Sequence, residues 1–519
     1  MPSGQIVSPR KAARVAIMGG GPGGLFAARL IARAHPDWHV TVYERMPPTD
    51  TYGFGIGLTG GLMRTIDAVD PELRARLAPI LFDDLDASFS FHLSHETAVV
   101  QGNGGGHVGT LPRAALLQVL TAGAREAGAE VSIGEAPPTD ELMSACDLVV
   151  CAEGVGGATR AAFADQLGVH ETQSRGQLIW CGADAALRSA HFTAAQTPHG
   201  TFVGHAYPYT SERATVVIEA DDESIERAGC ATEAFGAEGD SDATSLEYLS
   251  EAFTGLLGGA LLLGNRSRWR RFLQLRCERW HHKNLVLIGD AVATAHPSLG
   301  SGTKLAMESA ATLAEVIYNE GIGPDALATF DALRRPAVEA LQERALRSQL
   351  WWESFPKRLG RLGADRLVVA YLSRAGAVPL DALARVAPAV AARAVADWAD
   401  VDSADVPMHD LANWVLSRGA AHDLAGAASD LQVNCNDPWG PAADALVAEA
   451  RARQAGGAAV LRIVGEPTRA AALDRLALAE RLRLELGLRV AVAMEAGESD
   501  DAAAGLVAGR ADAVTTVAR

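Results

Sequence analysis

Two hydrophobic spacings alternate along the chain, and their order predicts its elements. Residues 14–44 begin with the apolar run "RVAIM", continue with apolar residues at helical spacing, and end in the alternating run "VTVYE". Residues 285–309, "LVLIGDAVATAHPSLGSGTKLAMES", repeat the order of strand, glycine turn and helix. Both segments are typical of an α/β fold in which a glycine turn follows a parallel strand.

The region between these turns changes to a spacing of two. "TFVGHAYPY" and "RATVVIEA" alternate or carry β-branched residues, which predicts a separate sheet. Helical spacing dominates residues 325–400, and strand and helix alternate again near the C-terminus, as in βα units. We therefore expect a Rossmann-like domain in two parts, 1–175 and 276–400, the second with a helical segment. A β-sheet insertion at 176–275 and a C-terminal unit at 401–519 complete the chain.

The first glycine turn has the spacing of a dinucleotide-binding fingerprint. Gly19, Gly21 and Gly24 follow the strand in G-x-G-x-x-G register, which suits a tight turn, a close approach to a pyrophosphate and helix packing. Glu44 ends the second strand 20 residues after Gly24, where a ribose needs an acceptor. The fingerprint alone separates neither NAD from FAD nor a nucleotide site from a plain strand–turn–helix crossover.

Composition narrows the range of partners. The 48% apolar and 21% charged residues are ordinary for a globular protein, and a net charge of −17 argues against nucleic acid. Six cysteines show neither C-x-x-C nor zinc-ligand spacing, so no metal site is expected. No apolar run is long enough to span a membrane, and "MPSGQIVSPRKAAR" has no apolar core. We expect a cytoplasmic protein with no membrane partner.

A Gly-Asp turn roughly 270 residues after a G-x-G-x-x-G turn resembles the single-component FAD-dependent aromatic hydroxylases. The resemblance implies FAD as cofactor, with NAD(P)H and O₂ as cosubstrates. It also implies that Asp290 binds the flavin ribityl chain and that Arg113 lies beside the cofactor. "CAEGVGGATR" resembles the motif shared with NAD(P)H, with Glu153 in place of the usual aspartate. The predicted cofactor-binding residues are Gly19, Gly21, Pro22, Gly24, Glu44, Arg45, Arg113, Glu153, Gly154, Gly289, Asp290, Gly300, Ser301, Gly302 and Thr303.

Several blocks narrow the resemblance to the branch that acts on aromatic CoA thioesters. "LIWCGAD", "HGTFVGHAYPY" and "GSGTKLAMES" are similar to salicylyl-CoA 5-hydroxylase and 2-aminobenzoyl-CoA monooxygenase/reductase, over roughly residues 14–355. The chain departs from that branch at Ala293, where a histidine is usual, at Pro297, where an aromatic residue is usual, and at Ser309, where an aspartate is usual.

The C-terminal unit resembles the last units of an old-yellow-enzyme barrel. It holds only about 120 of the about 250 residues that a complete barrel needs. We expect a remnant without FMN that serves packing or dimerisation, so a homodimer is a candidate assembly.

The resemblance implies oxygen transfer from a flavin peroxide to a ring held as a CoA thioester. We predict that His296 and Pro297 line the pocket from the flavin side and that His205 and Tyr207 line it from the sheet. A purely structural role is equally open for each histidine. Two basic runs, Arg266–Arg271 and Pro356–Arg366, either meet the CoA phosphates or are solvated helix faces.

The specific prediction is a dioxygenase that combines ring epoxidation or hydroxylation with oxidative cleavage of the CoA ester, as in tropone and tropolone biosynthesis. It rests on the shortened C-terminal unit and on the changed residues of the Gly-Asp turn. The alternatives are a salicylyl-CoA or anthraniloyl-CoA 5-hydroxylase and a non-catalytic FAD-binding protein.

Overall fold

The structure is a computed structural model that describes residues 12–516 except 48–49, 52, 84–87, 94–95, 102–106, 231–239, 421–427, 434 and 436. Most of the N-terminal segment in which no leader is expected therefore lies outside the described residues. Within the described part of the chain, no helix combines the length and the apolar character needed to cross a membrane.

A six-stranded sheet forms the half of the molecule that contains both glycine turns. Its order is β15-β16-β8-β1-β2-β7, with β15 (His281–His282) antiparallel at one edge and the other strands parallel. The parallel strands are β1 (Arg14–Met18), β2 (His39–Glu44), β7 (Glu130–Ile133), β8 (Leu148–Cys151) and β16 (Leu285–Leu287). Only β8 separates β1 from β16, so the two glycine turns leave the same edge of the sheet. The α/β class predicted from the sequence is confirmed.

Helices cover this sheet and bury its apolar strands. The main ones are α1 (Pro22–Ala34), α4 (Arg113–Glu126) and α11 (Gly302–Glu320), and shorter helices follow the strands. The shorter elements are α2 (Gly60–Val69), α3 (Pro71–Leu77), α5 (Thr139–Ala145), α6 (Ala158–Ala162) and α7 (Ala164–Leu167), with a hairpin of β3 (Gly55–Thr59) and β6 (His107–Pro112). The core is continuous from β1 through α1 and α11 and along α12 (Pro324–Glu353) as far as Ala345.

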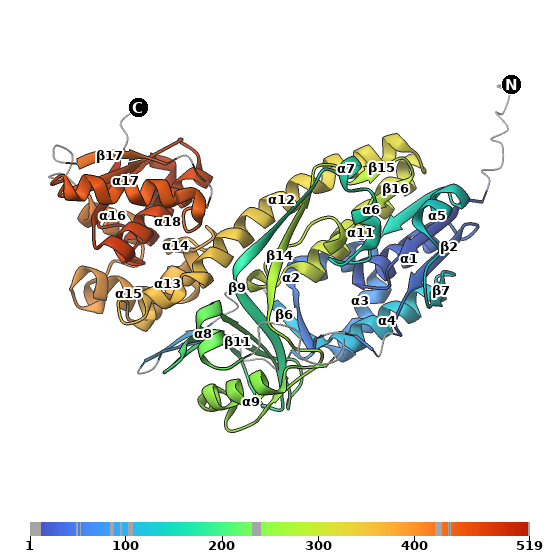
Figure 1. Cartoon of the computed structure of the whole chain (residues 1–519), viewed down its shortest axis with the longest axis horizontal. Helices are drawn as coiled ribbons and strands as arrows, with labels where there is room; N and C mark the ends of the chain where they lie inside the picture. Colours follow the sequence, from blue (N-terminus) through green and yellow to red (C-terminus); the bar gives the residue numbers. More distant parts are fainter. Residues whose placement is uncertain are drawn as a thin grey trace.

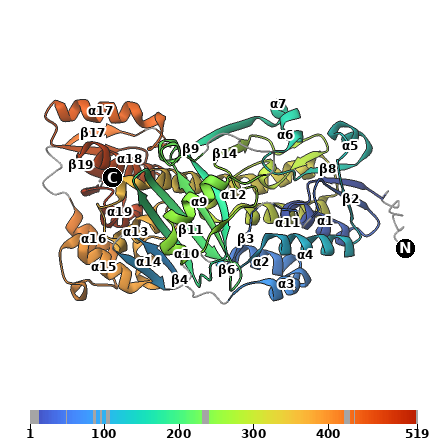
Figure 2. The same cartoon turned by 60° about the horizontal axis from the view of Figure 1, so that its bottom comes forward.

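A larger, mainly antiparallel sheet lies beside the first (Figure 2). Its order is β13-β9-β12-β11-β10-β4-β5, and β14 also pairs with β9. The central strands are β9 (Val169–Ala183), β10 (Ala190–Thr197), β11 (Gly200–Pro208) and β12 (Ala214–Ala220). The remaining strands are β4 (Ser88–His92), β5 (Thr97–Gln101), β13 (Leu262–Leu263) and β14 (Arg270–Cys277), and one face packs on α8 (Asp222–Arg227), α9 (Ala243–Ala252) and α10 (Thr254–Leu257). The sheet thus takes strands from before residue 176 as well as from the predicted insertion.

The long helix α12 connects this region to the C-terminal unit (Figure 1). After it come η4 (Phe355–Arg358), α13 (Ala364–Ser373), α14 (Leu380–Val386), α15 (Pro388–Ala399) and α16 (Leu411–Gly419). The C-terminal unit holds four parallel strands, β17 (Ala428–Gln432), β18 (Val460–Val464), β19 (Arg489–Met494) and β20 (Ala513–Thr516), with α17 (Asp444–Ala455), α18 (Arg469–Leu486) and α19 (Ser499–Val507). One buried cluster runs from β4 and β5 through α13 into this unit. The boundaries at 175, 275 and 400 stay predictions.

Candidate active site

The first glycine turn joins β1 to α1 and leaves its middle open. Gly19 has a left-handed backbone, φ +107°, and a Cβ there would lie 2.3 Å from the Ala152 carbonyl oxygen. A Cβ at Gly24 would lie 2.0 Å from the Gly19 carbonyl oxygen, so helix and strand pack directly. Gly21 has no atom within 4 Å of that position, and no side chain caps the end of α1, which Pro22 opens. An uncapped helix end beside open space is the geometry that binds phosphate.

Glu44 reaches back to this turn from the end of β2. Its Oε2 accepts a hydrogen bond from the Gly20 amide at 2.6 Å, and its Oε1 accepts one from the Met46 amide at 3.0 Å. A carboxylate has further lone pairs, so the predicted contact with a ribose remains open to it. Arg45 is exposed and forms no ion pair with a described residue.

The second glycine turn packs against the first through α11. Cβ atoms at Gly23 and Gly289 would lie 3.1 Å and 3.0 Å from the Ala306 Cβ atom, so one small residue contacts both turns. Gly289 and Gly300 both have left-handed backbones, with φ +62° and +59°. The α11 helix begins at Gly302, followed by Thr303, without a side-chain cap. The buried Ser301 hydroxyl has no hydrogen-bond partner among the described residues.

Asp290, Arg113 and Tyr207 are neighbours, although they come from three separate motifs. Asp290 is exposed, yet desolvation by the surrounding protein raises the pKa of its carboxyl, and Arg113 acts in the opposite direction. Arg113 Nε donates to Thr51 Oγ1 at 3.1 Å. Desolvation lowers the pKa of Arg113, and Asp290 and Tyr207 oppose that shift.

These features fit FAD. Two uncapped helix ends and an open turn suit the pyrophosphate, whereas Asp290 and the unpartnered Ser301 hydroxyl suit the ribityl chain and the ring. The individual cofactor contacts stay predictions.

The turn after β8 is fixed by its own side chains. Glu153 Oε2 accepts a hydrogen bond from the Thr159 amide at 3.1 Å, and the Cys151 thiol lies 3.3 Å away. Gly154 has φ +75° and no atom within 4 Å of a Cβ position. Buried Arg160 donates to the Ala291 carbonyl at 3.3 Å and so ties this turn to the Gly-Asp turn. Glu153 therefore shapes the turn, while Gly154 is its open point.

A largely buried carboxylate, Glu219, lies between the two predicted histidines. His205 Nε2 lies 3.2 Å from Glu219 Oε1, and His296 Nε2 lies 3.9 Å from Glu219 Oε2. Desolvation acts to raise the pKa of Glu219, but His296, His205 and Arg374 together lower it below its usual range. Burial lowers the pKa of His296 to about 4, so its imidazole is neutral at pH 7. The site thus pairs an ionised carboxylate with a neutral imidazole, and Arg374 is its permanent positive charge.

A chain of hydrogen bonds orients His296. Its Nδ1 lies 2.9 Å from Ser298 Oγ, which lies 2.6 Å from Ser348 Oγ on α12. Arg374 Nε donates to Ser348 Oγ at 2.8 Å. Pro297 opens the short helix between His296 and Gly300, so it sets the direction in which the histidine leaves the backbone. Because Nδ1 faces the serine, Nε2 is the nitrogen that faces Glu219.

Aromatic side chains surround this polar group. The His205 ring packs edge-on against Trp352 at 4.2 Å between centroids, and Phe272 meets His296 in the same way at 5.1 Å. The Arg374 guanidinium lies 3.9 Å from the centroid of the Tyr371 ring. The wider cluster consists of Phe89, Phe91, Phe192, Trp351, Trp352, Phe355 and Tyr371.

Tyr207 and Phe54 lie where the large sheet meets the start of β3. The Tyr207 hydroxyl donates to the Gly55 carbonyl at 2.9 Å, and burial raises its pKa to about 12, so it keeps its proton. Phe54 packs against β9, where a Cβ at Gly182 would lie 2.5 Å from its ring. Of the four predicted catalytic residues, His205 and His296 meet at Glu219, while Tyr207 lies near Arg113.

Sequence reasoning missed Glu219 and Arg374. The only sign of Glu219 in the sequence is that a carboxylate stands within the apolar run "VVIEA".

The two basic runs differ in the structure. Arg266 pairs with Asp50 at 2.8 Å and Arg271 pairs with Asp222, which accounts for much of the first run. The second run lines a cavity described below.

Comparison with known proteins places the chain in a family. A model of the FAD binding domain matches residues 139–345. Salicyloyl-CoA 5-hydroxylase of a Streptomyces species is 36% identical over 66% of this chain, and the match spans 66% of that relative's length. The 3-hydroxy-4-methyl-anthranilyl-[aryl-carrier protein] 5-monooxygenase of Streptosporangium sibiricum is 35% identical over 66% of this chain and 90% of its own length.

Solved structures support the same fold. 2-Methyl-3-hydroxypyridine-5-carboxylic acid oxygenase aligns with a TM-score of 0.54 at 17% identity, over 70% of this chain and 96% of that chain. PqsL of Pseudomonas aeruginosa aligns with a TM-score of 0.50 at 19% identity, over 66% of this chain and 97% of that chain. The chain is an oxidoreductase with FAD as its cofactor and NAD(P)H and O₂ as cosubstrates. It belongs to the FAD-dependent aromatic monooxygenases of the hydroxylase type.

Proposed function

We propose that this enzyme oxygenates an aromatic ring that is presented as a CoA thioester. The names of the two relatives support a ring carried as a thioester, on CoA in one and on an aryl carrier protein in the other. Within the structure, the proposal rests on the buried group of His205, Glu219 and His296, which lies between the Gly-Asp turn and the aromatic cluster.

FAD, when bound, supplies the oxygen chemistry, and the protein must bind, orient and shield the ring. The aromatic cluster packs against an apolar ring and excludes water. Neutral His296 accepts the Ser298 amide hydrogen bond at Nδ1, so its proton lies on Nε2, which faces Glu219 and can donate a hydrogen bond to a substituent of the ring. Glu219 accepts a hydrogen bond from a hydroxyl or amino substituent of the ring and so fixes its orientation. His205 of β11 lies within ion-pair distance of Glu219 on the side away from Nε2 of His296.

Anaerobic reduction of the yellow protein by NADH and NADPH tests the proposal, with and without salicylyl-CoA and anthraniloyl-CoA. Products formed under ¹⁸O₂ are then analysed by mass spectrometry. We expect reduction that a ring thioester accelerates, and one labelled oxygen on a ring whose CoA is retained. A flavin that neither nucleotide reduces in the presence of any ring thioester would contradict the proposal and favour a non-catalytic FAD protein.

A second candidate is a dioxygenase that also cleaves the thioester, on a seven-membered-ring ester of the tropone kind. The observation that favours it is the changed second turn, where Ala293 precedes His296 by three residues and Pro297 follows it directly. Ser309 bears less on the choice, since its hydroxyl donates to the Leu305 carbonyl at 2.7 Å, away from the aromatic cluster. Label in both the ring and the released carboxylate, together with free CoA, would establish this reaction.

A further inference from the structure

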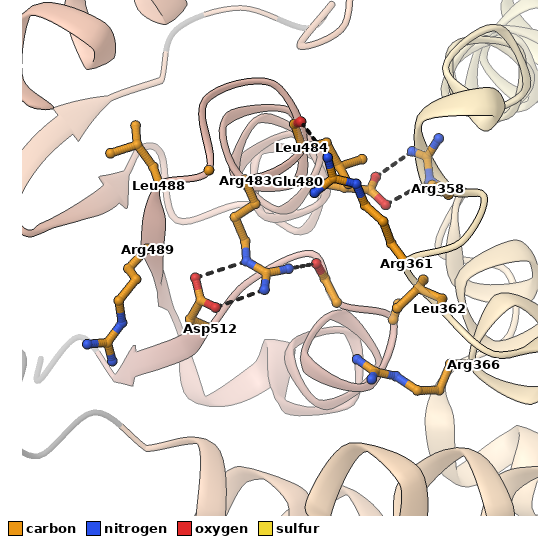
Figure 3. A pocket seen from close by; sticks show the side chains of 13 residues that line it. Arg358, Arg361, Leu362, Arg366, Glu480, Arg483, Leu484, Leu488, Arg489 and Asp512 are labelled. Atoms are coloured by element: carbon orange, nitrogen blue, oxygen red, sulfur yellow. Dashed lines mark hydrogen bonds and ion pairs between the residues drawn. The ribbon is translucent and has the colours of Figure 1, made fainter.

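An arginine-lined cavity of about 500 Å³ lies between the helical segment and the C-terminal unit (Figure 3). Its walls come from η4 and the start of α13 on one side and from α18, β19 and the turn after α19 on the other. Five arginines line it, namely Arg358, Arg361, Arg366, Arg483 and Arg489. The volume falls in the range of small-molecule sites. No residue predicted to bind the ring or FAD contributes to it.

The cavity holds more positive charge than its own carboxylates neutralise. Arg358 forms a buried pair with Glu480 at 2.6 Å, and Arg483 pairs with Asp512 at 2.8 Å. Glu480 and Asp512 are the two carboxylates of the lining, so three arginines exceed them. This excess stands out in a chain with a net charge of −17. A concave basic site in an acidic protein concentrates anions.

None of the remaining three arginines pairs with a carboxylate of the cavity lining. Arg366 Nε donates to the Val507 carbonyl at 2.8 Å, and its Nη1 lies 3.4 Å from the exposed Asp397. Arg361 donates to the Leu484 carbonyl at 3.4 Å, and Arg489 has no ion-pair partner in the described part of the chain. Guanidinium groups that carbonyls or distant carboxylates hold loosely retain donors for a ligand.

Two of the guanidinium groups converge on Gly509, whose carbonyl accepts a hydrogen bond from Arg483 Nη1. A Cβ at Gly509, where φ is +70°, would lie 3.5 Å from Arg366 Nη2 and 3.6 Å from Arg483 Nη1. Figure 3 shows both side chains directed toward the same space. Desolvation lowers the pKa of Arg366, and the charge of Arg483 lowers it further, whereas Asp397 opposes both. Like charges that meet in a partly desolvated cavity are stabilised when an anion lies between them.

We propose that this cavity binds the phosphate groups of a nucleotide-sized ligand. Arginine forks match phosphate oxygens in pairs, and several of them suit a ligand with more than one phosphate. The favoured source is the phosphorylated end of the CoA thioester, and this choice rests on the proposed function. Trp352 of the aromatic cluster and Arg358 of the cavity belong to one continuous segment, the end of α12 and η4. NADPH carries the same chemistry and is the other source.

Calorimetric titration of the FAD-loaded protein tests the proposal with CoA, 3′-dephospho-CoA, NADPH and inorganic phosphate. The variant Arg361→Glu/Arg489→Glu reverses two loosely held charges of the cavity. The matched control Arg344→Glu/Arg451→Glu makes the same change at exposed arginines of α12 and α17 outside it. We expect CoA to bind at least about tenfold more weakly to the cavity variant, and within about twofold of wild type to the control.

The outcomes separate the sources. A selective loss for CoA that is smaller for 3′-dephospho-CoA places the 3′-phosphate in the cavity, and a selective loss for NADPH alone assigns the cavity to the cosubstrate. Equal weakening by the cavity and control variants, or no binding of any of the four probes to wild type, overturns the proposal. Because binding needs no turnover, failure to oxygenate a ring thioester would refute the proposed function and leave this result standing.

Discussion

Replacing His296 by asparagine is expected to remove part of the loss of stability that the protein suffers between pH 7.5 and pH 5. Burial lowers the pKa of His296 to about 4 in the folded protein, whereas the unfolded chain has the ordinary value of 6.5. Below pH 6.5 the unfolded state therefore binds a proton that the folded state does not, and the free energy of unfolding falls as the pH falls. Those two pKa values give a loss of about 2 kcal/mol at pH 5.

Urea unfolding at saturating FAD, followed by tryptophan fluorescence at pH 7.5, 6.5, 5.5 and 5, measures the difference. Asparagine keeps an acceptor for the Ser298 amide. Loss of the ring contact with Phe272 lowers the free energy of unfolding by the same amount at every pH, so it does not change the pH dependence. Burial also lowers the pKa of His191 to about 4, and His191 contributes equally to both proteins. Ionised Glu219 also contributes to the stability of the folded protein, but this contribution is lost only below the pH range of the experiment, because the pKa of Glu219 is lowered. If the free energy of unfolding depends on pH in the same way in wild type and variant, His296 is not a neutral buried imidazole and the reasoning is refuted.

Three further changes test the cofactor turn, the C-terminal contact and the polar site. Gly21→Val should weaken FAD binding at least about tenfold and leave the apoprotein's stability within about 1 kcal/mol, since nothing lies within 4 Å of its Cβ position; normal flavin retention in a fluorescence titration would contradict this. Arg358→Met should cost about 3–5 kcal/mol in urea unfolding by leaving Glu480 unpaired, and Arg358→Met/Glu480→Leu should recover most of it; equal losses in both would count against that pair. Glu219→Gln should lower turnover about 100-fold and leave flavin reduction in stopped flow within about twofold; slower reduction would instead place Glu219 at the nucleotide step.

The sequence predicts the two glycine turns well because their geometry is local. The roles of Gly19 and Gly24 follow from spacing alone, and the structure shows the close backbone contacts that exclude a side chain at both. The convergence of the turns also follows, since parallel strands bring their carboxyl ends to one edge. What spacing could not give is the contact between them through Ala306, which depends on how α1 and α11 pack.

Features that depend on distant pairing escaped prediction. Glu219 reaches the histidines because β12 pairs in register with β11, and Arg374 joins them only after α12 and α13 have packed on that sheet. The same limit applies to β4 and β5, because β4 pairs with β10, which lies far along the chain, and β5 pairs with β4.

The function of a basic run is ambiguous in the sequence for a related reason. "RSRWRR" and "PKRLGRLGADR" are similarly basic, but distant acidic partners neutralise much of the first and leave part of the second to line a cavity.

The helix α12 makes the C-terminal unit part of the candidate active site rather than an appendage. Gln342 donates to the carbonyls of Leu275 and Thr294 at 2.7 Å and 2.8 Å, so the helix fixes the backbone of the Gly-Asp turn. Six residues further along the helix, Ser348 belongs to the hydrogen-bond chain of His296. Between them Arg347 pairs with Asp474 of α18 at 3.0 Å. Because one rigid helix carries all three contacts, displacement of the C-terminal unit would shift the serine that orients His296, and the aromatic cluster would lose the core that it shares with that unit.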